Sequence, residues 1–416
     1  MGDPKSTLPE LALDTPLALP NGAVIKNRLM KSAMSEQLAD AEHRPTRRLA
    51  ALYERWATGG VGLCITGNVM IDRRALGEPR NVVLEDDREL ATFRAWADAA
   101  GSHGMQTWMQ LNHPGKQIPL FLSRQPVAPS AVPLGAGLDR VFALPRALTD
   151  AEIREIIERF GRSAELAQRA GFTGVQIHGA HGYLVSQFLS PLHNRRDDDW
   201  GGSAENRRRF VLEVYKTMRS AVGNSYPVAI KLNSADFQHG GFTENDSLEV
   251  VRALAAAGID LIEVSGGNYE APAMTGHGVR PSTLAREAYF LDFAAQVRGA
   301  VAVPVGVTGG FRTAPGMLAA IRGGATDLVG LARPLAVYPD LPMRLMKDDL
   351  LRVDLPRPST GVRFLDRILV LDITWFEHHL KRLAEGRSPR PRGGPWPVVW
   401  RMLTATGRQM LRRRRA

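Results

Sequence analysis

The sequence has little of three features that would each mark a particular class of protein. It contains a single cysteine, Cys64, so it forms no internal disulfide and cannot build a cysteine-based zinc site or iron–sulfur cluster by itself. No apolar run approaches the roughly 20 residues that a membrane-spanning helix needs. The N-terminal stretch MGDPKSTLPE includes acids and prolines and lacks the apolar core of a signal peptide. These absences favour a cytoplasmic protein without a metal centre.

Acidic residues are also nearly missing from one segment, residues 380–416. This segment contains eleven Lys and Arg residues and one acid, Glu385, so it accounts for the whole formal net charge of +10. The rest of the chain is balanced in charge. A basic charge spread over the whole chain would indicate a nucleic-acid or membrane protein. A neutral body with a basic tail gives no such indication for the main function, and we expect no nucleic-acid partner.

Eight short apolar runs follow one another along the chain, and helical patterns lie between them. Runs that are apolar throughout, rather than alternating, indicate buried parallel strands. We expect strands over residues 28–34, 61–69, 105–111, 174–181, 228–235, 261–265, 304–308 and 327–332. We expect helices over residues 46–58, 87–100, 150–169, 203–222, 245–257 and 313–322. Eight strand–helix units are typical of a (β/α)8 TIM barrel, which is an α/β fold.

Glycine placement separates this barrel from an open doubly wound sheet. A doubly wound sheet would carry its glycine-rich loop after the first strand, whereas the glycine signals here lie late, at the seventh and eighth runs. Residues 16–27 are expected to form a short hairpin that closes the barrel floor. We therefore divide the chain into a barrel, residues 1–350, and a helical C-terminal extension, residues 351–416, with an Arg-rich basic tail.

The densest group of reactive side chains is His178, His181 and Tyr183, at the end of the fourth predicted strand. Residues at the carboxyl ends of barrel strands face the active site. Two imidazoles and a phenol offer two hydrogen-bond donors and one transferable proton. Buried structural histidines or a metal pair are the competing interpretations, but no set of further ligands stands at the other strand ends.

Other polar positions follow later strands. Lys231 lies inside the fifth strand, where a buried ammonium needs an anionic partner from substrate, cofactor or protein. Late strand–helix loops of a barrel commonly hold phosphate, and here they read TGGF and GLAR. The loop over residues 190–207 is polar and glycine-punctuated, and it is equally consistent with a surface turn. This set lacks a nucleophile–base pair, so it suits an enzyme whose cofactor supplies the chemistry.

Several stretches resemble the Old Yellow Enzyme family of FMN-dependent ene-reductases (NADH:flavin oxidoreductases). The most recognisable is HGAHGYLVSQFLSPLHNRRDDDWGGSAENRRRF, which begins at His178. NRLMKSAMSE, QLNHPGKQ, KLNSADF, VTGGF and DLVGLARP also occur in the family's order, so the resemblance covers roughly residues 14–346. It implies that residues 1–350 form a (β/α)8 barrel that binds FMN non-covalently.

The resemblance also implies which residues contact the flavin. They are Ala33, Met34, Ser35, Gly67, Asn68, Gln110, Lys231, Gly309, Gly310, Ala332 and Arg333. Ser35 takes the place of a Thr or Cys near the flavin C4 carbonyl. A positive charge on Lys231, near N1 and the C2 carbonyl, would stabilise the anionic reduced flavin.

For the reaction, the resemblance implies that His178 and His181 hydrogen-bond the carbonyl oxygen of an activated alkene. Tyr183 would protonate the α-carbon after hydride reaches the β-carbon. NAD(P)H, as co-substrate, would reduce the flavin first at the same site, which gives ping-pong kinetics. One subgroup of the family has a tyrosine where this chain has Gln37, so that substrate contact is not implied here.

Two interpretations from other classes compete with this one. In the first, the barrel is a phosphate-binding lyase or isomerase in which Lys231 forms a Schiff base. In the second, the barrel is inactive and the tail is primary. From about Val398 the tail has a basic amphipathic pattern, since Arg401, Arg408, Arg412 and Arg415 fall within about 60° on a helix. Residues 386–416 are therefore candidates for contact with a membrane or an acidic partner, against a solvated terminus. Oligomeric state stays open.

Overall fold

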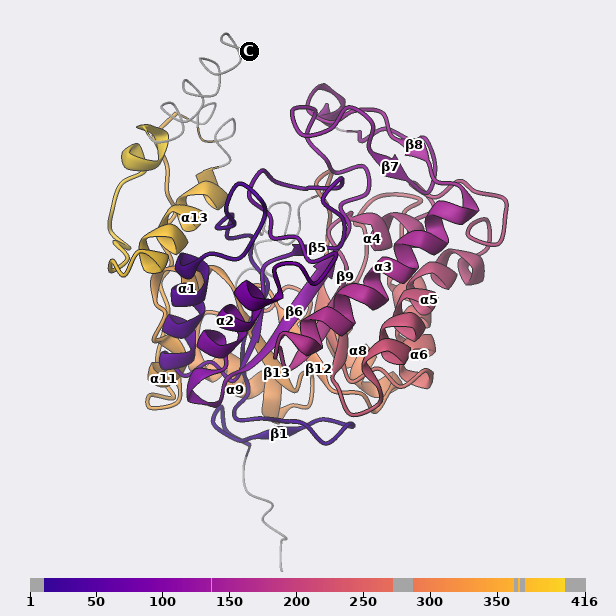
Figure 1. The fold of residues 1–416 in the computed structure, drawn as a ribbon. Coiled ribbons are helices and arrows are strands. Elements are labelled where there is room, and N and C mark those ends of the chain that lie inside the picture. The colour runs from indigo at the N-terminus through magenta and orange to yellow at the C-terminus, as the bar shows by residue number, and fades with distance from the viewer. Residues whose placement is uncertain (1–10, 136, 272–286, 363–365, 367–370, 401–416) are drawn as a thin grey trace, which may run out of the picture.

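The computed structural model describes residues 11–135, 137–271, 287–362, 366 and 371–400 (Figure 1). Its centre is a closed barrel of eight parallel strands. They are β3 (Leu29–Lys31), β4 (Leu63–Ile65), β6 (Gln106–Asn112), β9 (Gly174–Gly179), β10 (Val228–Asn233), β11 (Leu261–Ser265), β12 (Val305–Thr308) and β13 (Leu328–Leu331). Each strand pairs in parallel with the next, and β13 pairs with β3 to close the ring. The predicted (β/α)8 barrel is confirmed.

The strands match the predicted apolar runs closely. The predicted bounds of β11 are those observed, and most others are shorter by a few residues. The largest difference is in the run predicted over residues 61–69, where β4 ends at Ile65 and residue 69 belongs to a separate short strand. β3 ends early at Lys31, whose side chain forms a buried ion pair with Glu36.

Helices surround the barrel. They include α1 (Arg47–Thr58), α2 (Leu90–Ala100), α3 (Asp150–Arg169), α5 (Ala204–Val222), α6 (Glu244–Ala256), α8 (Leu291–Ala300) and α9 (Ala314–Arg322). The predicted bounds of α3 are those observed. The Thr149 side chain accepts from the Glu152 backbone N–H while the Glu152 carboxylate accepts from the Thr149 backbone N–H, which satisfies two otherwise unpaired donors at the helix start. The sequence did not predict α8.

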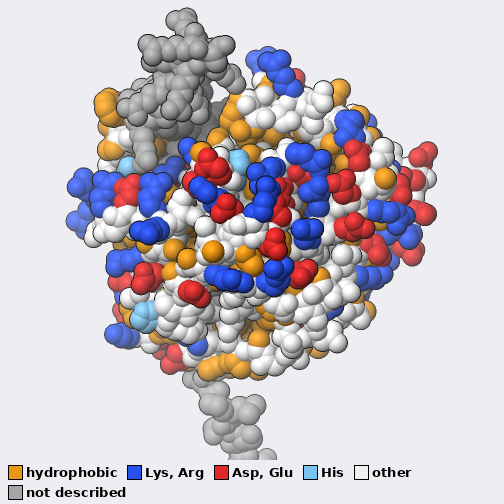
Figure 2. Space-filling view, in the orientation of Figure 1, with side chains coloured by type: hydrophobic (Ala, Val, Ile, Leu, Met, Phe, Trp, Pro, Cys, Tyr) orange, Lys and Arg blue, Asp and Glu red, His pale blue; other side chains and the backbone are white. Residues whose placement is uncertain are grey.

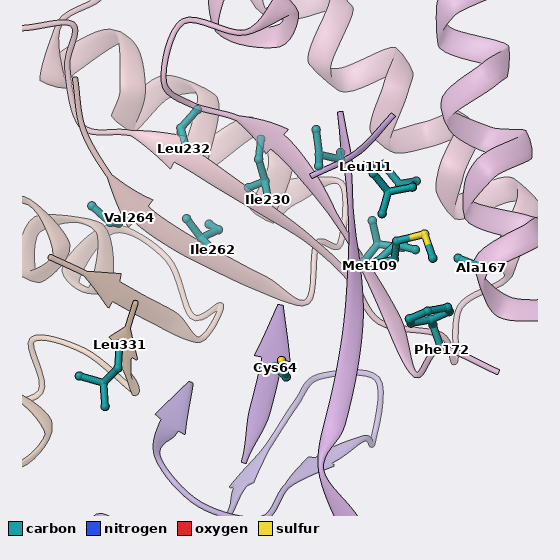
Figure 3. Close-up of a cluster of buried hydrophobic side chains, with 14 of the residues drawn as sticks. Cys64, Met109, Leu111, Ala167, Phe172, Ile230, Leu232, Ile262, Val264 and Leu331 are labelled. Atoms are coloured by element: carbon teal, nitrogen blue, oxygen red, sulfur yellow. The ribbon is translucent and has the colours of Figure 1, made fainter. Parts of the chain in front are cut away.

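Apolar side chains fill both sides of the barrel wall. Figure 3 shows part of the outer layer, in which Met109, Leu111 and Ile230 face the surrounding helices. A second cluster lies inside the barrel and includes Trp108 and Met30. The hairpin of β1 (Leu17–Ala18) and β2 (Val24–Ile25) adds its own apolar residues to this inner cluster, so the predicted floor is confirmed.

Several short elements were not predicted. They are β5 (Val69–Met70), α4 (Leu184–Leu189), α10 (Arg333–Val337), α11 (Leu341–Leu345) and a small parallel pair, β7 (Val127–Ala128) with β8 (Arg146–Ala147). The β7–β8 pair belongs to the insertion after β6 and lies above the barrel (Figure 1).

The C-terminal extension packs on the flank of the barrel through α13 (Leu371–Ala384), which contacts α1 and α10 (Figure 1). Trp375, Leu380 and Leu383 of this helix are buried. The division at residue 350 stays a prediction. Residues 396–400 are helical, but the predicted arrangement of tail arginines begins at Arg401 and lies outside the described residues.

Charged side chains of both signs are interspersed over the face of the barrel shown in Figure 2, as expected for a body with balanced charge. Of the helices in the described part of the chain, none is long and apolar enough to cross a membrane.

Candidate active site

The centre of the site is a buried ion pair between neighbouring strands. Lys231 of β10 stands in register with His178 of β9 on one side and with Glu263 of β11 on the other. The Lys231 Nζ lies 3.0 Å from Glu263 Oε1, and both side chains are almost fully buried. The anionic partner that Lys231 requires is therefore a protein carboxylate. Burial is the largest single influence and opposes ionisation of Glu263, but the Lys231 ammonium together with hydrogen bonds from Thr308 and Gln176 outweighs it and holds the pKa of this carboxyl below its usual range.

A hydrogen-bonded layer extends from this pair across the barrel. Glu263 also accepts hydrogen bonds from Gln176 at 2.8 Å and from Thr308 at 2.6 Å. Gln110, the glutamine expected at the flavin, donates from Nε2 to Gln176 Oε1 at 2.8 Å. Ser32 and Thr308 share a 2.5 Å hydrogen bond on the far side. Because each member is held by another, the layer is a preorganised polar surface beneath the mouth of the barrel.

The two histidines and Tyr183 meet above this layer. The ring centroids of His178 and His181 are 5.2 Å apart, and those of His178 and Tyr183 are 4.8 Å apart. Burial lowers the pKa of both histidines well below the usual value, and the positive charge of Lys231 lowers it further. Both imidazoles are thus neutral at pH 7, so each has one N–H to donate.

The hydrogen bonds of His178 determine which nitrogen carries that proton. Its Nδ1 accepts from the backbone N–H of Ala180 at 3.3 Å, which places the proton on Nε2. His181 bonds Ser265 Oγ through Nε2 at 2.9 Å. Its backbone has φ of 61°, an uncommon left-handed conformation, and its N–H is held by Asn233 Oδ1 at 3.2 Å.

A second buried ion pair lies at β3 and in the chain after it, and Tyr53 connects this pair to the chain after β4. Lys31 Nζ lies 3.1 Å from Glu36 Oε1, and Tyr53 donates to the same oxygen at 2.9 Å. The Gly67 backbone N–H then donates to the Tyr53 hydroxyl at 2.9 Å. A side chain at residue 67 would collide with the Glu36 carboxylate, so glycine is required there. This pair fixes the segments that carry the expected flavin contacts at residues 33–35 and 67–68.

Two side chains from these segments have partners that the sequence did not indicate. Ser35 Oγ donates to Glu78, whose pKa is raised by burial, and Asn68 Oδ1 accepts from Asn81 at 3.5 Å. Ala33 and Met34 are half-buried beside Ser35. Glu78 is a component of this wall that the sequence analysis missed.

The loops after β12 and β13 carry Arg312 and Arg333, whose positive charges act on each other. Gly309 and Gly310 have φ of 127° and 95°, which only glycine adopts readily, and Ala332 precedes Arg333 at the start of α10. Burial, followed by the charge of Arg333, lowers the pKa of Arg312. Two like charges close together favour an anion between or beside them. Arg312 directly follows the GGF sequence and was missed as a candidate.

These groups fit FMN by their chemistry. A buried polar layer with one ammonium suits the flavin ring, and two arginines beside flexible glycine backbone suit its phosphate. In the parts of the chain that the structure describes, no three His, Cys, Asp or Glu side chains are grouped so as to hold a metal ion.

The barrel and its site define a flavin-dependent oxidoreductase of the Old Yellow Enzyme type. The sequence model of the NADH:flavin oxidoreductase / NADH oxidase family matches residues 12–350, and the chain belongs to that family. Members use non-covalent FMN, with NADH or NADPH as the reductant.

Among curated relatives, the NADH-dependent flavin oxidoreductase iliE of Hypocrea jecorina (strain QM6a) is 40% identical over 362 residues, covering 81% of this chain and 89% of that protein. The NADH oxidase of Thermoanaerobacter brockii is 36% identical, covering 77% of this chain and 48% of its own length.

Solved structures agree. The old yellow enzyme homologue of Zymomonas mobilis superposes with a TM-score of 0.69 and 25% identity, covering 82% of this chain and 94% of that one. A 2-naphthoyl-CoA reductase gives a TM-score of 0.75 with 26% identity over 80% of this chain. This chain spans about half of that larger protein, at 52%.

Proposed function

We propose that the protein is an ene-reductase that uses NAD(P)H and FMN to reduce the double bond of an α,β-unsaturated carbonyl compound or a related electrophile. The observation that carries the proposal is the meeting of two neutral imidazoles, His178 and His181, with the phenol of Tyr183 at the mouth of the barrel. Such a group polarises a carbonyl and supplies a proton without a metal or a nucleophile.

FMN, when bound, supplies the hydride that it takes from NAD(P)H. Gln110 and Lys231 would hold its ring, and Arg333 with Gly309 and Gly310 would hold its phosphate. Because Glu263 fixes the Lys231 ammonium at 3.0 Å, the positive charge is already in place before the flavin is reduced.

The histidines bind and polarise the substrate. His178 Nε2–H is free to donate, since its Nδ1 is occupied by the Ala180 N–H. His181 donates from its other nitrogen when Nε2 accepts from Ser265. Two donors to one carbonyl oxygen draw electron density from the conjugated β-carbon, and the same donors stabilise the enolate that develops.

Tyr183 then gives its hydroxyl proton to the α-carbon. Its ring packs against that of His178, so the carbonyl and the protonated carbon are served by adjoining side chains. Burial raises the pKa of Tyr183 well above 10, which keeps the phenol protonated until the enolate forms.

The test separates the two half-reactions by anaerobic stopped-flow absorbance of the flavin. Tyr183→Phe should leave reduction by NADH or NADPH nearly unchanged and slow reoxidation by cyclohexenone about 100-fold or more. Tyr338→Phe, which changes a phenol near Asp354, is the matched control. Equal slowing of both half-reactions in Tyr183→Phe would contradict its role as proton donor.

Steady-state initial rates test the ping-pong order. Double-reciprocal plots at several alkene concentrations should be parallel, because both substrates use one site in turn. Intersecting lines would show that NAD(P)H and alkene bind together and would remove this part of the proposal.

A second proposal concerns the C-terminal segment: residues 386–416 contact an anionic membrane surface. Trp396 and Trp400 are 59% and 72% exposed on one helical turn, where four-residue spacing places them on the same side. Exposed tryptophans next to a basic segment suit the headgroup region of an anionic bilayer.

Co-sedimentation with vesicles decides this second proposal. The full chain should bind vesicles of phosphatidylserine and phosphatidylcholine, while the 1–385 truncation and Trp396→Ser with Trp400→Ser should bind less. Equal behaviour of the full chain and the truncation removes the membrane proposal and leaves an acidic protein partner or a solvated terminus.

A further inference from the structure

The proposed proton donor lies where it cannot easily recover its proton from water. Only 8% of the Tyr183 surface is exposed, and one side of its ring is covered by His178. Every turnover would leave a phenolate at this position. Among the residues that the structure describes, the hydrogen-bond partner of its hydroxyl is the hydroxyl of Tyr269, at 3.0 Å.

Tyr269 is much more accessible than its partner. It follows β11, its ring centroid is 6.1 Å from that of Tyr183, and 40% of its surface is exposed. Surrounding protein nevertheless desolvates the phenol enough to raise the pKa of Tyr269 to about 12, so both hydroxyls stay protonated at pH 7.

The turn that carries Tyr269 is anchored on its N-terminal side. The buried Asn268 side chain accepts from the backbone N–H groups of Glu270 at 2.9 Å and Ala271 at 2.8 Å, and donates to Gln238 at 3.0 Å. Asn268 also pairs with His181 in an isolated bridge. The position of Tyr269 is thereby tied to the substrate-binding histidine.

The C-terminal side of the turn is held by a second set of contacts. Glu270 accepts from the backbone N–H of Gly135 at 2.5 Å and lies 3.3 Å from His193 Nε2. His193 Nδ1 is 2.9 Å from the buried Lys116 Nζ. Anchors on both sides leave the Tyr269 ring little freedom, as a repeated proton transfer between two hydroxyls requires.

We propose that Tyr269 returns the proton to Tyr183 after each turnover. This step rests on the proposed function, because it presupposes that Tyr183 is the donor. First the Tyr183 O–H bond breaks as the Cα–H bond of the product forms. Then the Tyr269 O–H bond breaks as the Tyr183 O–H bond re-forms, and water or a buffer acid restores the proton of Tyr269. The return of the proton is acid–base chemistry that changes no oxidation state, and one solvent proton is consumed for each alkene reduced.

Tyr269 acts on the reaction through Tyr183, by passing a proton to it. The first turnover of enzyme with protonated Tyr183 does not need it, whereas each later turnover does. The Tyr269→Phe variant should therefore reduce its first equivalent of alkene at close to the wild-type rate. Its later turnovers should be slower than those of wild type by a factor of roughly ten or more. Tyr269→His, which replaces one proton carrier with another, should restore much of the steady rate. Tyr338→Phe is the matched control and should behave as wild type.

A second readout does not depend on turnover. The exchange of the Tyr183 hydroxyl proton with water can be followed in the flavin-loaded protein by the deuterium isotope shift of its 13Cζ resonance. Tyr269→Phe should slow this exchange, and the control variant should not.

The possible results separate the two proposals. A wild-type steady rate in Tyr269→Phe overturns the relay, and so does unchanged hydroxyl exchange. Equal slowing of first and later turnovers also overturns it, since Tyr269 would then only support the ring of Tyr183. If Tyr183→Phe itself reoxidises normally, the proposed donor fails as well; if only Tyr269→Phe is normal, the donor stands without the relay.

Discussion

Two carboxyl groups, one fully buried in the barrel and one half-buried in the C-terminal extension, have pKa values shifted in opposite directions. Glu263 of β11 lies 3.0 Å from the Lys231 ammonium, and its pKa is lowered. Glu377 of α13 accepts from the neutral amide of Gln37, at 3.2 Å to each oxygen, and burial together with the charge of Glu78 raises its pKa to about 7. Burial alone disfavours a carboxylate, so the neighbour decides whether the group is ionised at neutral pH.

The comparison also shows how the extension reaches the active-site wall. Gln37 stands two residues after Ser35 and has φ of 50°, an uncommon conformation for this residue type. The Glu377 carboxylate holds its side chain from the extension, outside the segment matched by the family model. Arg333 likewise lies 5.9 Å from the ring of Phe376 on the same helix.

The largest effect is expected when the barrel carboxylate loses its cation. Lys231→Met leaves Glu263 buried beside an apolar side chain, and breaking a buried pair in this way costs about 3–5 kcal/mol in free energy of unfolding. Urea denaturation at pH 7 measures it. The double variant Lys231→Met with Glu263→Gln removes both charges and should recover part of the loss. If the double variant is no more stable than Lys231→Met, the pair is not what stabilises this layer.

Removing the two histidines should have the next largest effect, on ligand binding. The double variant His178→Ala and His181→Ala should weaken binding of a phenolate ligand about 100-fold, since hydrogen bonds to a charged group contribute about 1.5 kcal/mol each. Titration of the flavin absorbance with p-chlorophenol measures the change, and the exposed His239→Ala is the matched control. An unchanged dissociation constant would place the ligand elsewhere in the barrel.

How much of the fold and of the site the sequence could predict depends on how far apart in the chain the contacting residues lie. The apolar strands, the hairpin and the His178–Tyr183 group follow from local patterns, and the structure brings the three side chains together. Glu263 could have been found, because Lys231 needed an anion and Glu263 is the one acid in the next strand, LIEVS. Glu377 could not, because its contact with Gln37 joins residues 340 positions apart and exists only once α13 docks.

The pH dependence of the free energy of unfolding tests the second carboxyl group, Glu377. Glu377 has a higher pKa folded, about 7, than unfolded, about 4.5, so the native state binds the extra proton between these values. The contribution of Glu377 to the free energy of unfolding is therefore fully present below about pH 4.5 and is lost as the pH rises to 7. Partial exposure limits the loss to about 1–2 kcal/mol. The Glu377 carboxyl is faced by Gln37, Glu78, Lys381 and Tyr269, of which Glu78 and Lys381 act in opposite directions.

Glu377→Gln should remove that pH dependence. Urea midpoints of the variant and of wild type should diverge from pH 4.5 to 7, with the variant losing less stability. The exposed Glu54→Gln on α1, the helix that α13 packs against, is the matched control. Parallel curves for Glu377→Gln and wild type would show that the carboxyl titrates at an ordinary value.

The smallest effect is expected from the amide that contacts this carboxyl. Gln37→Leu keeps the approximate size of residue 37 and removes the donor to Glu377, at a cost of about 1 kcal/mol above pH 7. Since that amide lowers the pKa of Glu377, its loss should move the upper end of the stability transition to higher pH. The same urea series measures the shift, with the exposed Gln125→Leu as control. If the transition does not move, the pKa of Glu377 is set by burial and by the charges of Glu78 and Lys381. The difference from Glu263 is then a difference of surroundings rather than of one bonded neighbour.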